Sequence, residues 1–278
     1  MKNHLQNQVV IVTGAASGIG QQVAIQASAR GGYVIATDIG AAGLAETQKM
    51  MTEGQSEIHI LDVSEAAEIE IFAKKIILTL NNRPLVLVNN AGVALDCGPF
   101  VDTTLENFEW LLNINLWGVV RMTKAFVPYL LAQNSGHIVN ISSVFGLAGF
   151  ANQSAYCTAK FGVRGFTECL RMELYDTNIK TTVVHPGGIN TNIARAARVG
   201  GEITQEAHKR NTRIFNEKLT PTSPAEAARQ ILEAVRTKKE KLVIGSDGKL
   251  INLITRLLPV GYTKIFKKQL ENAENTKF

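Results

Sequence analysis

Three side chains near the middle of the chain have the types and the spacing needed for proton transfer. Ser143 precedes Tyr156 by 13 residues, and Lys160 follows Tyr156 by 4. The last two fall in a segment with helical periodicity, so they share one helix face about one turn apart. A free phenol has a pKa near ~10, and a nearby ammonium group favours its phenolate form. Because a serine hydroxyl can hold a substrate oxygen, this set predicts general acid–base chemistry.

A glycine-rich turn follows the first apolar segment and reads Thr13-Gly14-Ala15-Ala16-Ser17-Gly18-Ile19-Gly20. Glycines allow a tight turn and let backbone N–H groups approach a pyrophosphate, which the positive end of the next helix attracts. The spacing differs from the commonest Gly-x-Gly-x2-Gly fingerprint, and a turn without a ligand is the alternative. A helix-surface pair is likewise the usual explanation of an isolated Tyr-x3-Lys. Together, however, the two patterns predict hydride chemistry with a bound dinucleotide.

Asp38 ends the second apolar segment, 24 residues after Gly14. A carboxylate there can accept hydrogen bonds from both adenosine ribose hydroxyls, and it repels a 2′-phosphate. No Lys or Arg lies in the turn at Ala15–Ser17 or directly after Asp38 at Ile39–Ala41. The sequence therefore predicts NAD(H) rather than NADP(H), the alternative being an ordinary strand-end aspartate that caps a turn.

Short apolar segments alternate with helical patterns along the chain. Continuous runs such as Val-Val-Ile-Val are typical of strands buried on both faces of a parallel sheet. Repeated strand–helix units predict an α/β fold, namely a doubly wound, mostly parallel seven-stranded sheet with helices on both faces, of the Rossmann type. We expect strands at Val9–Thr13, Tyr33–Asp38, Glu57–Asp62, Leu85–Asn89, Gly136–Ser142, Lys180–His185 and Lys241–Ile244, and helices at Ile19–Arg30, Ala41–Thr52, Glu65–Leu80, Leu105–Leu131, Ser154–Asp176 and Pro224–Thr237.

Seven motifs, in order, resemble those of the short-chain dehydrogenase/reductase family. They span positions 13 to 191 and are Thr13-Gly14-x3-Gly18-x-Gly20, Asp62-Val63, Asn89-Asn90-Ala91-Gly92, Asn113-Ile114-Asn115, Ile141-Ser142-Ser143, Tyr156-x3-Lys160 and Pro186-Gly187-x3-Thr191. The resemblance implies an NAD(P)-dependent oxidoreductase that acts on alcohol or carbonyl groups. It is specific because the motifs occur together and in register.

The resemblance also implies roles for individual residues. Tyr156 would exchange the proton, Lys160 would lower its pKa and hold the nicotinamide ribose, and Ser143, rather than Ser142, would orient the carbonyl. Asn115 would anchor a water in a proton relay to Lys160. The implied cofactor contacts are Gly14, Ser17, Gly18, Ile19, Gly20, Asp38, Asp62, Val63, Asn89, Ala91, Gly92, Tyr156, Lys160, Pro186, Gly187, Ile189 and Thr191.

Three segments are expected to wall the substrate: Val93–Phe100, Val144–Gln153 and, as a lid, Thr191–Thr220. The middle segment is apolar and uncharged, which favours an apolar ketone or secondary alcohol. The lid carries cations that could face an anionic substrate, although a solvated helix face is the commoner explanation. A carrier-linked 3-oxoacyl reductase is therefore the alternative enzyme, and a non-catalytic NAD(H)-binding regulator is the alternative of another class.

We expect His185, before Pro186, to be a packed strand-end histidine.

Positive charge is concentrated at the C-terminal end. From Arg236 onward there are 10 Lys/Arg against 4 Asp/Glu, whereas the rest of the chain is nearly neutral, which argues against a nucleic-acid binder. We expect one catalytic domain over residues 1–246 and a basic amphipathic helical extension over residues 247–278. Packing of this extension on its own subunit or a neighbour is favoured over contact with a membrane surface.

The remaining features suggest an ordinary intracellular enzyme. No apolar run reaches the ~18 residues that span a bilayer, and the N-terminus lacks a signal peptide, so a cytoplasmic location is expected. Cys97, Cys157 and Cys169 lack metal-ligand spacing, and no metal is predicted. The long apolar-rich helices at Leu105–Leu131 and Ser154–Asp176 predict a two-fold homo-oligomer, a dimer or a tetramer.

Overall fold

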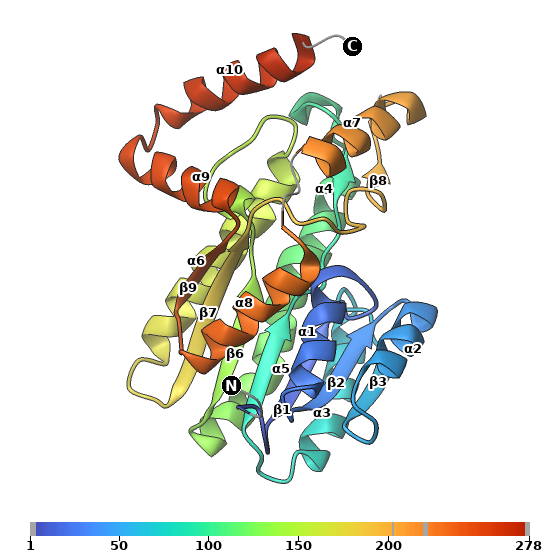
Figure 1. Ribbon diagram of the computed structural model, residues 1–278, viewed down its shortest axis with the longest axis vertical. Helices are drawn as coiled ribbons and strands as arrows, with labels where there is room; N and C mark the ends of the chain where they lie inside the picture. Colours follow the sequence, from blue (N-terminus) through green and yellow to red (C-terminus); the bar gives the residue numbers. More distant parts are fainter. Residues whose placement is uncertain (1–3, 202, 219–221, 276–278) are drawn as a thin grey trace.

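Seven parallel strands form the central sheet of the computed structural model, which describes residues 4–201, 203–218 and 222–275 (Figure 1). Their order across the sheet is β3-β2-β1-β4-β6-β7-β9, so the winding reverses between β1 and β4. Every neighbouring pair is parallel, which confirms the predicted doubly wound sheet. The strands are β1 (Val9–Thr13), β2 (Tyr33–Asp38), β3 (Ser56–Ile60), β4 (Leu85–Asn89), β6 (Gly136–Ile141), β7 (Ile179–Pro186) and β9 (Lys241–Ile244).

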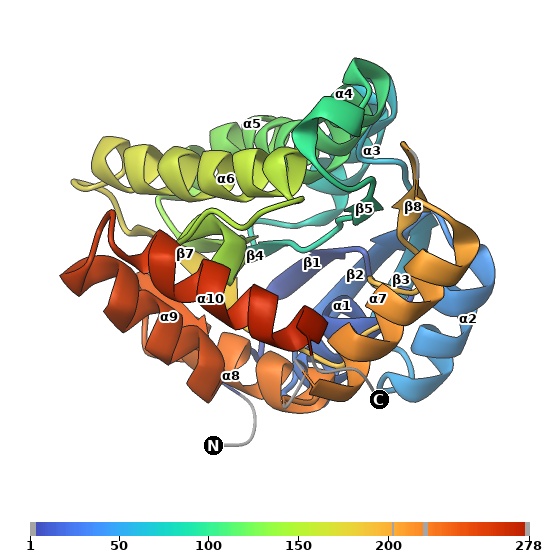
Figure 2. The same ribbon diagram turned by 90° about the horizontal axis from the view of Figure 1, so that it is seen from above.

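Each face of the sheet is covered by its own layer of helices (Figure 2). In β1, Val10 and Val12 join one buried apolar cluster while Val9 and Ile11 join the other, because successive side chains of a strand point to opposite faces. The first cluster is completed by α1 (Gly18–Ser28), α2 (Ala41–Met50) and α8 (Pro224–Arg236), and the second by α3 (Ala66–Thr79), α5 (Gly118–Gln133) and α6 (Ser154–Glu173).

The helix expected over Leu105–Leu131 is interrupted. It consists of α4 (Leu105–Leu112), a five-residue π-helical turn (Asn113–Trp117) and α5. A π turn inserts one extra residue into a helix and is frequent at functional sites. Apolar residues recur with helical spacing on both sides of the turn, so the sequence pattern does not reveal the inserted residue.

Several elements at the carboxyl ends of the strands were not predicted individually. The lid segment contains β8 (Arg198–Val199), which pairs in parallel with β5 (Leu95–Asp96), and the helix α7 (Gln205–Lys218). Two short 3₁₀ turns, Phe100–Asp102 and Val144–Gly146, lie at the same edge.

The C-terminal extension forms two helices, α9 (Ser246–Leu257) and α10 (Tyr262–Asn275), at the same end of the molecule as α7 (Figures 1 and 2). α9 leaves Leu250, Leu253 and Leu257 exposed, whereas Phe266 of α10 is buried. Within the described ranges, no helix has both the length and the apolar character needed to cross a membrane.

Candidate active site

Ser143 and Tyr156 meet beyond the end of β6. Ser143 lies just after this strand and begins the 3₁₀ turn Val144–Gly146, where its hydroxyl accepts a hydrogen bond from the Phe145 amide at 3.2 Å. Tyr156 lies in the first turn of α6, and its phenol is close enough to the Ser143 hydroxyl for that group to lower its pKa. The 13-residue spacing thus brings the two hydroxyls together, as the sequence pattern predicts.

Lys160 lies one helical turn after Tyr156 and is only 4% exposed. Its Nζ donates to the Ile141 carbonyl at 3.0 Å and lies 5.6 Å from the centroid of the Tyr156 ring. Burial disfavours the charged amine and lowers the pKa of Lys160 to about 8. Such burial argues against the alternative of an ordinary helix-surface pair.

The Tyr156 hydroxyl lies in surroundings that disfavour a charged phenolate. Burial raises the pKa of Tyr156 to about 12, although the neighbouring Ser143 hydroxyl acts in the opposite direction. The sequence argument expects the Lys160 ammonium to favour the phenolate, but in the chain by itself the burial effect is larger. A phenolate at Tyr156 therefore requires further positive charge close to its hydroxyl.

The π turn between α4 and α5 places Asn115 inside the site. Its amide is fully buried and makes two bonds to the Val93 backbone, accepting from N and donating to O, both at 2.8 Å. A methyl group on Gly92 would lie 3.2 Å from Asn115 Oδ1 and 3.6 Å from Lys160 Nζ. Asn115, Gly92 and Lys160 therefore lie around one small space.

The glycine-rich turn has the close packing expected of a nucleotide cradle. Gly14 has φ +67°, and a Cβ there would lie 2.7 Å from Ala91 Cα. A Cβ on Gly20 would lie 2.1 Å from the Gly14 carbonyl oxygen, so both positions require glycine. The Ser17 side chain does not cap α1, which leaves the amides of its first turn available to an anion. The residues present thus fit a pyrophosphate.

Asp38 is oriented by two backbone amides. Its Oδ2 accepts from Ala16 N at 3.0 Å and its Oδ1 from Gly40 N at 2.9 Å. The carboxylate is partly exposed beside the glycine-rich turn, so the alternative role of a turn cap and the role of a ribose acceptor are both compatible with these bonds. Each carboxylate oxygen of Asp38 keeps a second lone pair that can accept a hydrogen bond from a ligand hydroxyl.

Two further predicted positions contribute mainly to the framework. The Asn89 amide donates to Thr123 Oγ1 and Asn140 Oδ1 within the core. Val63 is buried, and a Cβ on Gly118 would lie 2.8 Å from Val63 Cγ2.

The turn after β7 is held by a residue that the sequence reasoning missed. Asp247, at the start of α9, accepts a hydrogen bond from Gly188 N at 2.6 Å and lies against Gly187. Ile189 forms an isolated parallel bridge with Thr222. Thr191 lies against Gly18, because a Cβ on that glycine would be 3.2 Å from Thr191 Cγ2. This turn therefore reaches the glycine-rich turn across the end of the sheet.

His185 is fully buried behind Ser143, in agreement with the expectation of a packed histidine. Its Nδ1 must be protonated, because it lies 2.9 Å from the Ser143 carbonyl oxygen, which can only accept. Burial lowers the pKa of His185 to about 4, so the ring is neutral at pH 7. This bond fixes the backbone of Ser143, a contact that the sequence did not reveal.

A row of aromatic rings extends from Tyr156 to the C-terminal extension. Phe145 meets Tyr156 edge-on at 5.6 Å and Phe150 at 4.3 Å between centroids. Phe150 in turn stacks on Phe266 of α10 at 5.2 Å. Tyr262 Oη accepts a hydrogen bond from the Gly149 amide at 3.0 Å. The extension therefore packs on the predicted substrate segment of its own subunit.

The lid segment is joined to the opposite wall by polar contacts. His208 Nδ1 of α7 lies 2.8 Å from Asp96 Oδ2 of β5. Arg198 of β8 stacks over the Trp110 ring at 3.7 Å. Two basic residues of the lid segment, Arg198 and His208, are thus engaged within the protein. We call β5, β8, α7 and α10 the substrate rim.

Comparison with known proteins agrees with this architecture. The sequence model described as short chain dehydrogenase matches residues 8–201. The putative oxidoreductase SadH of Mycobacterium tuberculosis is 35% identical over 264 residues, which cover 94% of both chains. Dehydrogenase/reductase SDR family member 7B of Xenopus tropicalis is 32% identical over 265 residues, covering 92% of this chain and 83% of the relative.

Solved structures resemble the chain over most of its length. A short-chain dehydrogenase from Streptomyces avermitilis has a TM-score of 0.80 at 30% identity, with 98% of this chain and all of that chain (100%) covered. The closed form of serine dehydrogenase complexed with NADP+ has a TM-score of 0.73 at 27% identity and covers 85% of this chain and 94% of its own. A short-chain dehydrogenase/reductase from Burkholderia phymatum in complex with NAD shares the fold, with a TM-score of 0.82 at 24% identity and coverage of 95% and 96%.

Proposed function

The chain belongs to the short-chain dehydrogenase/reductase family, and from this premise we propose that it is an NAD-dependent oxidoreductase that interconverts an apolar secondary alcohol and the matching ketone. The observation that carries this proposal is the proximity of the Ser143 hydroxyl to the Tyr156 phenol, one helical turn from buried Lys160. Two hydroxyls that meet beside a buried amine can hold a carbonyl oxygen and move one proton.

In the proposed mechanism, Ser143 and Tyr156 both hydrogen-bond the substrate oxygen. Tyr156 donates the proton during ketone reduction and accepts it during alcohol oxidation. Bound cofactor supplies the hydride acceptor or donor. Lys160 would place positive charge 5.6 Å from the centroid of the Tyr156 ring, and a nearby positive charge favours the phenolate. Asn115, whose amide is fixed by Val93, orders the proton path that ends at Lys160.

The cofactor would lie across the carboxyl ends of the strands. Gly14, Gly18 and Gly20, with the free amides at the start of α1, would hold its pyrophosphate. Asp38 would accept from the adenosine ribose and repel a 2′-phosphate, hence the proposed preference for NAD. The remaining contacts proposed are Ser17, Ile19, Asp62, Val63, Asn89, Ala91, Gly92, Pro186, Gly187, Ile189 and Thr191.

The segment that follows Ser143, together with the substrate rim, favours a small apolar substrate. Phe145 and Phe150 offer ring surface next to Tyr156. Arg198 is stacked on Trp110 and His208 is bonded to Asp96, so these two basic residues of the lid are already occupied. Their engagement argues against an anionic acyl carrier as the substrate. The homo-oligomer and the cytoplasmic location remain predictions, as does the division at residue 246.

Steady-state turnover tests this function. We expect purified protein to oxidise at least one member of a panel of apolar secondary alcohols, with kcat/KM for NAD+ exceeding that for NADP+ by at least ~tenfold, or about 1.4 kcal/mol. Asp38→Ala should narrow this ratio. A preference for NADP+ in the wild type would overturn the cofactor proposal, and a complete lack of turnover with intact NADH binding would favour the regulator.

A further inference from the structure

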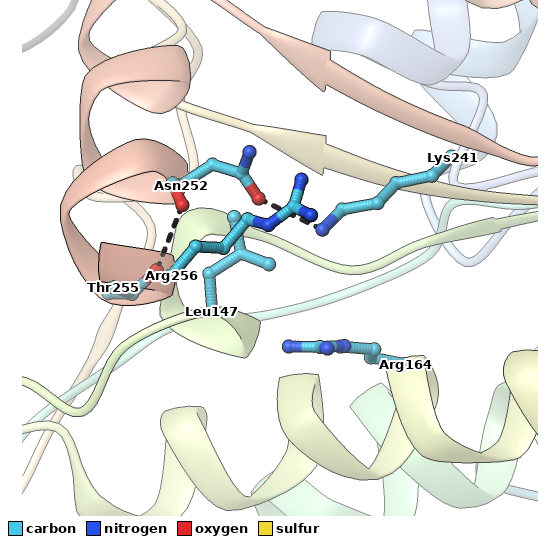
Figure 3. Close-up of a pocket in the computed structure, with 6 residues that line it drawn as sticks. All are labelled: Leu147, Arg164, Lys241, Asn252, Thr255 and Arg256. Carbon is cyan, nitrogen blue, oxygen red and sulfur yellow. Dashed lines mark hydrogen bonds between the residues drawn. The ribbon is translucent and has the colours of Figure 1, made fainter. Parts of the chain in front are cut away.

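A cavity that three cations line lies between α6, β9 and α9, beside the turn that follows Ser143 (Figure 3). Its volume is about 400 Å³. Side chains from three separate elements converge on it, and none of its lining residues, all in the described part of the chain, carries a carboxylate. The lining residues are Leu147, Arg164, Lys241, Asn252, Thr255 and Arg256.

The charges around this cation cavity are not balanced. Arg164 Nε pairs with Glu168 Oε1 at 2.9 Å, on its own helix. Among the described residues, Lys241 Nζ donates only to a neutral group, the Asn252 amide oxygen, at 2.9 Å. Arg256 makes no hydrogen bond or ion pair with any residue that the structure describes. One carboxylate therefore accompanies three cations, which leaves two positive charges unmatched.

The imbalance has an energetic consequence at Lys241. Burial lowers the pKa of Lys241, and the charges of Arg164 and Arg256 lower it further, while Glu168 acts in the opposite direction. Like charges held together in a partly desolvated space disfavour one another, and an anion placed among them removes that penalty.

The cation cavity also adjoins the loop that follows Ser143. Leu147 forms part of its wall, and Arg164 Nη1 lies 3.5 Å from the Gly146 carbonyl oxygen. Figure 3 shows Arg164 entering from α6, opposite Arg256 and Asn252 of α9. A molecule bound here would therefore contact the loop that follows Ser143.

We propose that this cavity binds a dianionic phosphate monoester. Such a group carries a charge of about −1.5 to −2 at pH 7, which matches the two unmatched positive charges. Two guanidinium groups and one ammonium group, arriving from different elements, suit tetrahedral phosphate oxygens, and guanidinium forks bind phosphate bidentately. A carboxylate would leave one charge unmatched. The inference does not depend on the proposed alcohol–ketone activity.

Isothermal titration calorimetry tests the inference with three probes: inorganic phosphate, glycerol 3-phosphate, and vesicles that contain phosphatidic acid in phosphatidylcholine. Excess NADH is present throughout, so that phosphate does not compete for the glycine-rich turn, and chloride keeps the ionic strength constant. We expect saturable binding of one molecule per chain for at least one probe. Binding of a soluble probe identifies a free phosphate or ester, whereas binding of acidic vesicles alone identifies a lipid headgroup.

Variants decide where the probe binds. Arg256→Gln, an exposed position, should weaken binding at least tenfold, and Lys241→Met should act in the same direction. Lys264→Gln removes an exposed charge from α10 outside the cavity and should leave the Kd within twofold. Absence of saturable binding for all three probes overturns the inference. Equal weakening by Arg256→Gln and Lys264→Gln also overturns it, since only a diffuse charge effect gives that result.

Discussion

The framework of the candidate site and its substrate rim are built in different ways. Around Lys160, Asn115 and Ser143, buried side chains are fixed by short bonds to main-chain atoms of the sheet and its adjoining turns. Around the rim, elements far apart in the sequence meet through single side-chain contacts such as His208 with Asp96 and Phe150 with Phe266. The difference indicates that the framework can hold the reacting groups in place while the rim determines which substrate binds. Substitutions in the framework should therefore affect cofactor binding and stability, and substitutions in the rim should affect KM.

Among the changes that compare the framework with the rim, the largest effect on ligand affinity is expected at Gly14. Gly14→Ala places a Cβ at 2.7 Å from Ala91 Cα on a backbone with φ +67°, so the turn must move. We expect NADH affinity, measured by fluorescence titration, to fall by ~100-fold or more, or about 3 kcal/mol. Gly54→Ala is the matched control, because Gly54 has φ +71° with no atom within 4 Å of the added Cβ. Equal loss of affinity in both variants would indicate general strain instead of a cofactor cradle.

Acid should destabilise the framework through His137. Its Nε2–H donates to Thr182 Oγ1 at 2.7 Å, because the Thr182 hydroxyl itself donates to the Lys239 carbonyl. Burial, with smaller effects of Lys238 and Lys180, lowers the pKa of His137 to about 4. The lowered pKa means that its contribution to stability is complete above pH ~6.5, the unfolded value, and is lost as pH falls toward 4.

The corresponding loss in the free energy of unfolding is about 3 kcal/mol between those pH values. Urea denaturation at pH 7.0, 5.5 and 4.5 measures it. His137→Asn should be less stable than the wild type at pH 7 but should show a flatter pH dependence. If the variant kept the full pH dependence, His137 would not be its source.

A smaller effect, on KM, is expected where α7 of the lid segment contacts β5. Asp96→Ala removes the carboxylate that holds His208, so closure of α7 over the substrate becomes less favourable. We expect KM for the alcohol to rise ~tenfold, about 1.4 kcal/mol, with kcat changed by less than ~threefold. Lys209→Gln, an exposed change on the same helix, serves as control. A drop in kcat with unchanged KM would place Asp96 in the chemistry and blur the distinction between framework and rim.

The smallest effect is expected at Phe266. This ring is 8% exposed and stacks on Phe150, whereas its neighbour Ile265 is 37% exposed. Phe266→Ala should lower kcat/KM for a bulky ketone by ~threefold, since the support of Phe150 is lost. Ile265→Ala should leave it unchanged. Identical values for wild type and Phe266→Ala would show that α10 does not support the substrate segment.

The division between framework and rim also sets what the sequence could predict. Four strands, β1, β2, β4 and β9, have the predicted bounds, because continuous apolar runs flanked by turn residues mark buried parallel strands. The meeting of Ser143 with Tyr156 was predictable, since one helix and the end of one strand fix it. The contacts of Asp247 with Gly188 and of His208 with Asp96 join residues 59 and 112 positions apart. No local pattern encodes such pairs, so the order of the elements in space had to be known first.

The π turn at Asn113–Trp117 was missed for a different reason. Its residues continue the apolar periodicity of α4 and α5, and one extra residue changes the phase too little to be read from the sequence. The family resemblance nevertheless singled out Asn115, whose burial against Val93 depends on that turn.

The most direct test of the central claim is to measure turnover and NADH binding of Tyr156→Phe beside the wild type, with the best alcohol from the panel. The substitution keeps the ring against Phe145 and removes only the hydroxyl. We predict that kcat falls by ~10³-fold, about 4 kcal/mol, while the Kd for NADH stays within ~twofold. Near-normal turnover of the variant would contradict the account, because the proton would then be moved by a group other than Tyr156.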